Sequence, residues 1–345
     1  MEYTDRLISF LKRNFILHRH EWISIEDLTS LNELLDAGLS IRNSLSLIRI
    51  SSNEKLIDEL LKRLDKGNLM EEIAGDYLPA RIASYLRPLL RNMSFAKALS
   101  LSLSFYHKSR DNSSRIEKSI LYPFVLLFVS LSALYLFDTY GLDPILNMLR
   151  SFGSDLSSFR VIRIILRIIV YVFYFGMLTV TGALLYFSRE KNITLFYLLC
   201  SRYLKNSLLQ VYFCEEFISL FLICIDLGYK TRDALSILKS LHNKPVVSFL
   251  AFHLEDKLLA GESLKDASRQ NYFDETLSRF INVAVYTDDF SHVLNNYVIL
   301  SQNRITAAMK KAANIIQASS YAAIGAIIIF IYQVLFLPMQ AISSF

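Results

Sequence analysis

The residues best suited to chemistry are few, and their spacing does not complete a site. His18 and His20 stand beside Glu21, a set of side chains that could ligate a metal ion. A zinc site needs three or four ligands in a closed arrangement, and no second cluster in the sequence supplies the rest. We therefore interpret this stretch as a solvated basic segment and predict no metal-binding residues.

Two acidic pairs, Glu215-Glu216 and Asp288-Asp289, are the other candidates for acid–base work. Neighbouring residues on a helix point about 100° apart, so such a pair does not converge on one substrate. The phosphate-binding pattern G-x-x-x-x-G-K-[ST], the dinucleotide pattern G-x-G-x-x-G and the nucleophile pattern G-x-S-x-G are all missing from the sequence. We predict that the protein is not an enzyme, with no catalytic residues and no cofactor, and we expect Asp288-Asp289 in a loop or helix cap.

Composition favours long helices in or near a membrane. Of 345 residues, 53% are hydrophobic, while Gly (10) and Pro (6) are scarce, which argues against turn-rich β folds and against disorder. The net charge of +5 is too mild to indicate a nucleic-acid-binding protein. The three cysteines, Cys200, Cys214 and Cys224, have no C-x-x-C spacing and fit burial as small apolar side chains in a reduced compartment.

Three uncharged apolar stretches are long enough to cross a bilayer, which takes about 20 residues. They are Ile120 to Phe137, Ile168 to Phe187 and Ala312 to Phe345. We predict transmembrane helices at 119–138 and 161–188, and a third transmembrane helix with the external C-terminus at 312–345. A further apolar run, Phe217 to Ile225, is bounded by acids and covers only nine residues, so we interpret it as the core helix of a polar domain. The N-terminal residues lack the apolar core of a signal peptide.

Lysines and arginines near the ends of these stretches predict the orientation, because they favour the cytoplasmic side. They flank the first and third stretches on the N-terminal side and the second on the C-terminal side, which puts the N-terminus inside and the C-terminus outside. The external loop at 139–160 then conflicts with the rule, since arginines lie in and just after it. We expect Arg160, Arg163 and Arg167 to share one helix face and to reach lipid headgroups.

The two long polar segments, 1–118 and 189–311, repeat the same pattern. Both contain a helical run, a glycine and then Arg-x-[AS]-Leu, and both contain a second glycine at a similar distance. The matched positions are Gly38 with Gly228, Leu45 with Leu235, and Gly67 with Gly261. Each glycine follows the last apolar residue of a helical pattern, as a C-terminal cap does, and Ser40 and Thr231 then lie near the next helix start. The fold class predicted is an all-α membrane protein with two related cytoplasmic helical-bundle domains and three transmembrane helices.

Three features carry a family resemblance. The polar domains and the predicted spans alternate in the order domain, span, span, domain, span. The Gly-to-Leu unit is repeated, and the second domain contains the stretch Gly261-Glu-Ser-Leu264. The chain resembles the type II secretion F and type IV pilus inner-membrane platform family. Its length and its ending, Ile331 to Met339, look most like the Gram-positive competence branch, the ComGB-type proteins. The family's late G-E-x-[ST]-G-x-L motif is not kept: Ala284 to Phe290 retains only a threonine and a large apolar residue, so no metal-binding role is carried over for that glutamate.

The resemblance implies a scaffold of the cytoplasmic membrane that couples a hexameric cytoplasmic ATPase to pilin-like subunits of a pseudopilus, which serves DNA uptake in the competence branch. It also implies a homodimer or higher homo-oligomer, contact with membrane lipid, and no direct binding of nucleic acid. Alternatives are the platform of another type IV pilus or type II secretion machine, and less strongly a transporter or a membrane adaptor subunit. A transporter would need ionisable residues inside its spans, and the three uncharged stretches contain none.

Overall fold

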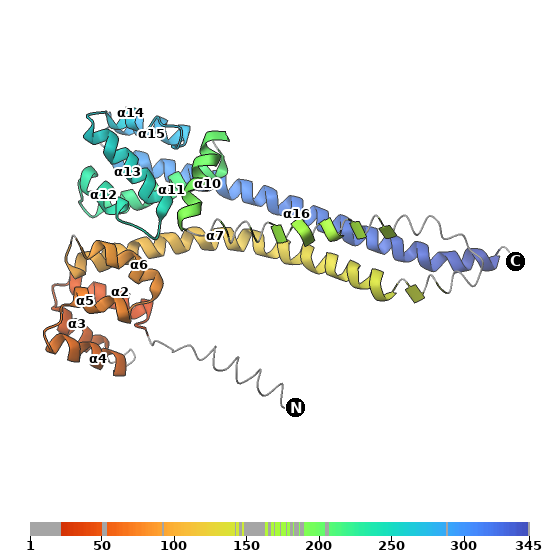
Figure 1. Ribbon diagram of the computed structural model, residues 1–345, viewed down its shortest axis with the longest axis horizontal. Coiled ribbons are helices and arrows are strands. Elements are labelled where there is room, and N and C mark those ends of the chain that lie inside the picture. The colour runs from red at the N-terminus through yellow and green to blue at the C-terminus, as the bar shows by residue number, and fades with distance from the viewer. Residues whose placement is uncertain are drawn as a thin grey trace. The chain divides into compact units, whose positions relative to one another are not determined.

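The protein is described from a computed structural model of the full chain (Figure 1). The structure describes residues 22–49, 54–91, 93–141, scattered positions between 143 and 186, and 190–203, 207–287 and 289–343. All regular secondary structure in these ranges is helical, which confirms the all-α class for the described part of the chain. The histidines at 18 and 20, most of the predicted external loop at 139–160 and much of the predicted span at 161–188 lie outside the described residues.

The described residues divide into two compact units. The first contains residues up to Ser109 and then Leu220–Glu255, and the second contains Arg110–Ser219 and Asp256–Phe345. This division does not follow the predicted boundaries at 118 and 189, because α7, α11 and α13 each contribute residues to both units. The predicted domain boundaries stay a prediction.

The first unit begins with five short helices. They are α2 (Ile25–Asp36), α3 (Ile41–Ile48), α4 (Glu54–Asp65), α5 (Met70–Tyr77) and α6 (Ala80–Leu89), followed by the start of α7 (Phe95–Leu136). The unit also takes in α12 (Thr231–Lys239) and most of α13 (Pro245–Leu259). Leucines and isoleucines on one side of each helix form the core of this unit. Among them are Leu31, Leu45, Ile57, Ile82 and Leu235, all fully buried.

The second unit contains the rest of α7, a π-helical turn η1 (Phe137–Gly141), α10 (Glu190–Tyr203) and the first part of α11 (Leu208–Asp226). It continues with α14 (Leu264–Ala267), α15 (Glu275–Ala284) and α16 (Phe290–Ser343). Helix α16 is 54 residues long without a break and joins the polar domain to the third apolar stretch. Helix α7 likewise passes the predicted boundary at 118 without interruption.

The two series α2–α7 and α11–α16 have the same order of elements. In each, a first helix, a short second helix and a longer third helix precede two short helices and one very long helix. The matched glycines fall at the same places, after the first and third helices of each series. Gly38 and Gly67 have φ of 87° and 87°, and Gly228 and Gly261 have φ of 86° and 85°.

Each of the four glycines ends its helix by the same pair of backbone hydrogen bonds. At the first, Gly38 N donates to Leu35 O at 3.0 Å and Leu39 N donates to Leu34 O at 3.1 Å. This is the Schellman arrangement, which needs a left-handed residue at the glycine position. The serine before α3 also caps as expected, since Ser40 Oγ accepts from Asn43 N at 3.3 Å. Thr231 also lies at the start of the next helix, as predicted, but it is the first residue inside α12, and Lys230 at the cap position makes no side-chain cap.

Replacing Gly228 with alanine should lower the free energy of unfolding by about 1–2 kcal/mol, the cost of a left-handed conformation for a residue with a Cβ. No atom lies within 4 Å of the added Cβ, so the loss reflects backbone strain alone. Gly228→Asn is the matched control and should lose less, because asparagine tolerates this region. Chemical unfolding of the detergent-solubilised chain, followed by circular dichroism, measures both; equal stability of the alanine variant and the native protein would contradict the prediction.

Among the described residues, one helix is long and apolar enough to cross a membrane by length and composition, namely α11. It is 19 residues long, so the argument that its apolar run is too short to span does not hold. Instead, 72% of its apolar window is buried within the protein, and Glu215 and Glu216 lie in its middle. Burial of this kind fits the core helix that the sequence suggested, and the three spans predicted elsewhere are not confirmed.

Candidate functional site

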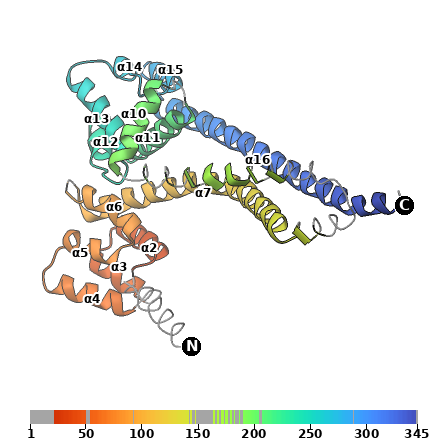
Figure 2. The ribbon, with the colours of Figure 1, turned by 45° about the vertical axis from the view of Figure 1, so that its right-hand side comes forward.

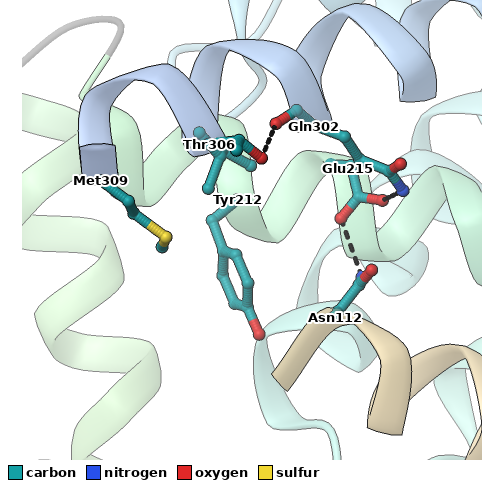
Figure 3. A pocket seen from close by; sticks show the side chains of 7 residues that line it. Asn112, Tyr212, Glu215, Gln302, Thr306 and Met309 are labelled. Atoms are coloured by element: carbon teal, nitrogen blue, oxygen red, sulfur yellow. Dashed lines mark hydrogen bonds between the residues drawn. The ribbon is translucent and has the colours of Figure 1, made fainter. Parts of the chain in front are cut away.

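A buried carboxylate lies in the middle of α11. The side chain of Glu215 is buried, with the residue 1% exposed, and it accepts hydrogen bonds from three side chains, of which Figure 3 shows those from Asn112 and Gln302. Gln302 Nε2 donates to its Oε1 at 2.7 Å, Ser219 Oγ donates to the same oxygen at 2.9 Å, and Asn112 Nδ2 donates to Oε2 at 3.0 Å. A carboxylate removed from water must be compensated in this way, because an unsatisfied buried charge is very costly.

The partners of Glu215 come from the two longest helices. Asn112 lies on α7 and Gln302 on α16, and both precede apolar stretches for which the sequence predicts membrane spans. Only Ser219 belongs to the same helix as the carboxylate. Glu215 therefore joins α7, α11 and α16 within the second unit, at the level where α7 and α16 leave the polar part of the sequence.

A shallow hollow, partly open to solvent, adjoins this junction. Its lining is mixed, with the carboxylate group and its amide donors on one side and apolar side chains on the other (Figure 3). The lining residues are Asn112, Tyr212, Glu215, Gln302, Ile305, Thr306 and Met309. No histidine, cysteine or lysine is among them, and both carboxylate oxygens already accept hydrogen bonds. The arrangement is suited to holding helices together rather than to acid–base catalysis.

A second polar cluster fixes the segment between α14 and α15 against α11. Gln210 Nε2 donates to the carbonyl oxygens of Asn271 and Phe273, at 2.9 Å each, and Cys214 Sγ accepts from Asp274 N at 3.3 Å. Burial raises the pKa of the Cys214 thiol to about 12, with a smaller opposite effect of the hydrogen bond from the Asp274 backbone. The thiol therefore stays protonated and unreactive at neutral pH.

A third cluster lies where α7 ends. The carboxylate of Asp138 accepts from Arg163 Nε at 2.7 Å and from Arg167 Nε at 2.6 Å. Arg163 also donates to Asp143 Oδ1 at 2.6 Å and to the Asp138 carbonyl oxygen at 2.9 Å. The sequence assigned these arginines no protein partner, whereas Arg163 and Arg167 both pair with a carboxylate 25 and 29 residues earlier in the chain. Their contact with lipid headgroups stays a prediction. Arg160 lies outside the described residues.

The repeat positions singled out in the sequence do not gather into a site. Gly38, Gly67, Gly228 and Gly261 lie at separate helix ends, and Leu45 and Leu235 are core residues with no exposed surface. Their roles are in the fold of each helix series. Among the described residues no group of three or more His, Cys, Asp or Glu side chains is placed to hold a metal ion.

The sequence predicts Glu215 only as half of a non-convergent acidic pair and indicates no partner for it. A signal was present: two acids interrupt an otherwise apolar pattern of 19 residues in α11. Acids in the middle of a helix that is apolar on all sides must be buried with partners. The other acidic pair behaves as expected at Asp289, whose Oδ1 accepts from His292 N at 3.0 Å and caps the start of α16.

A comparison with known protein families finds a match in the second helix series, α11–α16. Residues 217–338 match the family model of type II secretion system (T2SS), protein F. The matched range holds the end of α11, the helices α12 to α15 and most of α16. A comparison with curated proteins gives no match. The family match supports the platform family of type II secretion and type IV pilus machines and does not single out its competence branch. From Phe217 to Pro338, then, the chain is similar to the protein F domain of type II secretion systems.

Proposed function

We propose that this protein is an inner-membrane platform that couples a cytoplasmic hexameric ATPase to the assembly of pilin-like subunits. The T2SS protein F match over residues 217–338 is the observation that carries this proposal. The protein is further proposed to serve a competence pseudopilus in DNA uptake and to act as a homodimer or higher homo-oligomer. The ATPase supplies the energy, since the sequence has no phosphate-binding loop of its own.

Exposed apolar side chains support a place in the membrane for α7 and α16. On the distal part of each helix, large apolar residues face outward where a soluble protein would expose polar ones. On α7 these are Tyr122, Val125, Phe128, Val129, Tyr135 and Leu136, and on α16 they are Ile315, Tyr321, Ile328, Ile329, Tyr332 and Phe336. A helix satisfies its own backbone polar groups, so such surfaces are stable against lipid. We propose the multi-pass arrangement with the N-terminus inside and the C-terminus outside.

The junction at Glu215 suggests how movement would pass through the molecule. A force applied to the helical bundle reaches α7 and α16 together, because both helices bond to one carboxylate. Both helices are continuous, so a tilt at their polar ends is carried along their length. The pilin-like subunits would then be moved by lateral contact with the membrane segments.

Deleting the coding sequence in a naturally transformable host of origin tests this proposal, with complementation by the native gene as the control. We expect loss of surface filaments, scored by electron microscopy, together with loss of DNA uptake, scored with labelled DNA. Loss of filaments with normal DNA uptake would indicate that the protein serves another type IV pilus or a type II secretion machine instead of a competence pseudopilus. Unchanged filaments and unchanged secretion would contradict the platform role.

A further inference from the structure

Helix α10 (Glu190–Tyr203) has one face that packs into the protein. Tyr197 is fully buried, its ring centroid lies 5.4 Å from that of Phe213 on α11, and its hydroxyl donates to the carbonyl oxygen of Tyr272. Ser201, one turn further on, is also buried. This face fixes the rotation of the helix about its own axis.

The opposite face of α10 carries large apolar side chains in the open. Leu195, Leu199 and Tyr203 are 60%, 55% and 77% exposed and follow one another at intervals of four residues, so they form one line along the helix. At about 100° per residue, the two leucines lie about 160° from Tyr197. A helix that packs one face on a water-soluble bundle normally turns polar residues outward at this angle. Arg202, exposed on the same side, is the exception.

The place of α10 in the chain connects this face to the membrane. The second predicted span ends at residue 188, two positions before the helix begins, and Asn192 Nδ2 donates to the Tyr186 carbonyl oxygen at 3.0 Å. The start of α10 is thereby bonded to the last residues of the predicted span. In both ribbon views α10 runs across the direction of α16, which carries the third predicted span (Figures 1 and 2). A helix across the direction of a spanning helix lies along the membrane plane.

We infer that α10 is an interfacial helix, with Leu195, Leu199 and Tyr203 inserted at the boundary of headgroups and acyl chains in the cytoplasmic leaflet. This inference rests on the membrane arrangement proposed above. The composition of the face matches lipid: leucines enter the acyl region, tyrosine lies at the headgroup level, and Arg202 faces anionic phosphate groups. Direct continuity with a predicted span favours lipid over a second copy of the chain as the occupant. The helix would hold the second unit at a fixed height on the membrane surface.

Depth-dependent fluorescence quenching tests this on the full chain, reconstituted in vesicles of phosphatidylglycerol and phosphatidylcholine. Leu195→Cys and Leu199→Cys are made separately in a Cys200→Ser background and labelled with a maleimide fluorophore. The remaining cysteines do not interfere: Cys214 and Cys224 have no exposed surface, and burial raises the pKa of each to about 12. Arg279→Cys on α15, where the native side chain is 76% exposed, is the control.

We expect doxyl groups near the headgroup end of the lipid chains to quench the labels at 195 and 199, and to leave the label at 279 unquenched. Adding Leu199→Glu to the Leu195→Cys reporter should remove that quenching. Labels at 195 and 199 that behave like the one at 279 would overturn the inference. Cross-linking of 195 or 199 to the same position in a second copy, without quenching, would also overturn it and assign the face to a subunit contact.

A reporter in the third predicted span separates this inference from the proposed function. Tyr332 is exposed on α16, and Tyr332→Cys should be quenched by doxyl groups deep in the acyl chains. Quenching at 332 without quenching at 195 and 199 leaves the membrane arrangement standing and overturns the interfacial role of α10. No quenching at 332 overturns both.

Discussion

Replacing Glu215 with leucine should lower the free energy of unfolding by about 3 kcal/mol or more, because three donors, two of them buried, lose their acceptor at once. The donors are Asn112 Nδ2, Gln302 Nε2 and Ser219 Oγ, and leucine offers them no oxygen. Glu215→Gln should lose less, about 1–2 kcal/mol, since it keeps one acceptor oxygen but turns an amide N–H₂ toward another donor. Unfolding of the detergent-solubilised chain by urea, followed by circular dichroism, measures both values.

Glu275 on α15 provides the control for this comparison. Its carboxylate is exposed and pairs with Arg279 on the same helix at 2.5 Å, so Glu275→Gln should change stability by less than about 0.5 kcal/mol. Pairing Glu215→Gln with Gln302→Leu in a double-mutant cycle then gives the coupling between α11 and α16. If the effects of these two substitutions on stability simply add, Glu215 and Gln302 are not coupled and the junction is contradicted. A Glu215→Leu variant as stable as the Glu275→Gln variant would contradict it as well.

The Glu215→Gln variant also bears on the proposed function. If the junction passes movement between the helical bundle and the long helices, this variant should yield fewer filaments in the complemented deletion strain at normal protein level. The Glu275→Gln variant should restore filaments fully. Normal filament yield from a Glu215→Gln variant with a measured loss of stability would show that the junction supports the fold alone.

Asp138→Asn is expected to cost about 2–3 kcal/mol, because a carboxylate that is itself buried loses its charge-assisted hydrogen bonds to two partly exposed arginines. The Asp138 side chain is 7% exposed and accepts from both Arg163 and Arg167, so the variant leaves two guanidinium groups near a neutral amide. Arg163 keeps Asp143, which limits the loss at that residue. Thermal unfolding in lipid nanodiscs, followed by circular dichroism, measures the change.

Asp143→Asn is the matched control for Asp138, because both carboxylates bond to the same arginine. The Asp143 side chain is 57% exposed, and an exposed ion pair contributes about 0–1 kcal/mol. The two variants should therefore differ by several degrees in melting temperature, with Asp138→Asn the lower. Equal melting temperatures would show that burial of Asp138 does not govern the strength of this cluster.

Local features of the sequence determined most of the secondary structure. The glycines at 38, 67, 228 and 261 follow the last apolar residue of a helical pattern, and each has a positive φ and ends a helix. Such a cap depends on a few consecutive residues, so it can be predicted without knowledge of the rest of the chain. Thr231 shows how precisely the sequence locates a helix start. Its hydroxyl could cap α12 only from the position before the helix, and the backbone places Thr231 one residue inside. The family resemblance of residues 217–338 could be predicted for a similar reason, because it rests on the order of local elements along the chain.

The polar junctions were decided by the tertiary structure. Glu215 meets Asn112 and Gln302 across 103 and 87 residues of sequence, and no pattern in α11 indicates which distant amides complete its shell. The same holds for Asp138, which the sequence placed at the end of a predicted span with no assigned partner. Hydrogen bonds and ion pairs of this kind depend on the angle and depth at which separate helices pack, and a distance change of about 1 Å is enough to break them. Apolar periodicity fixes which face of a helix is buried, whereas only packing in three dimensions fixes which buried polar atoms meet.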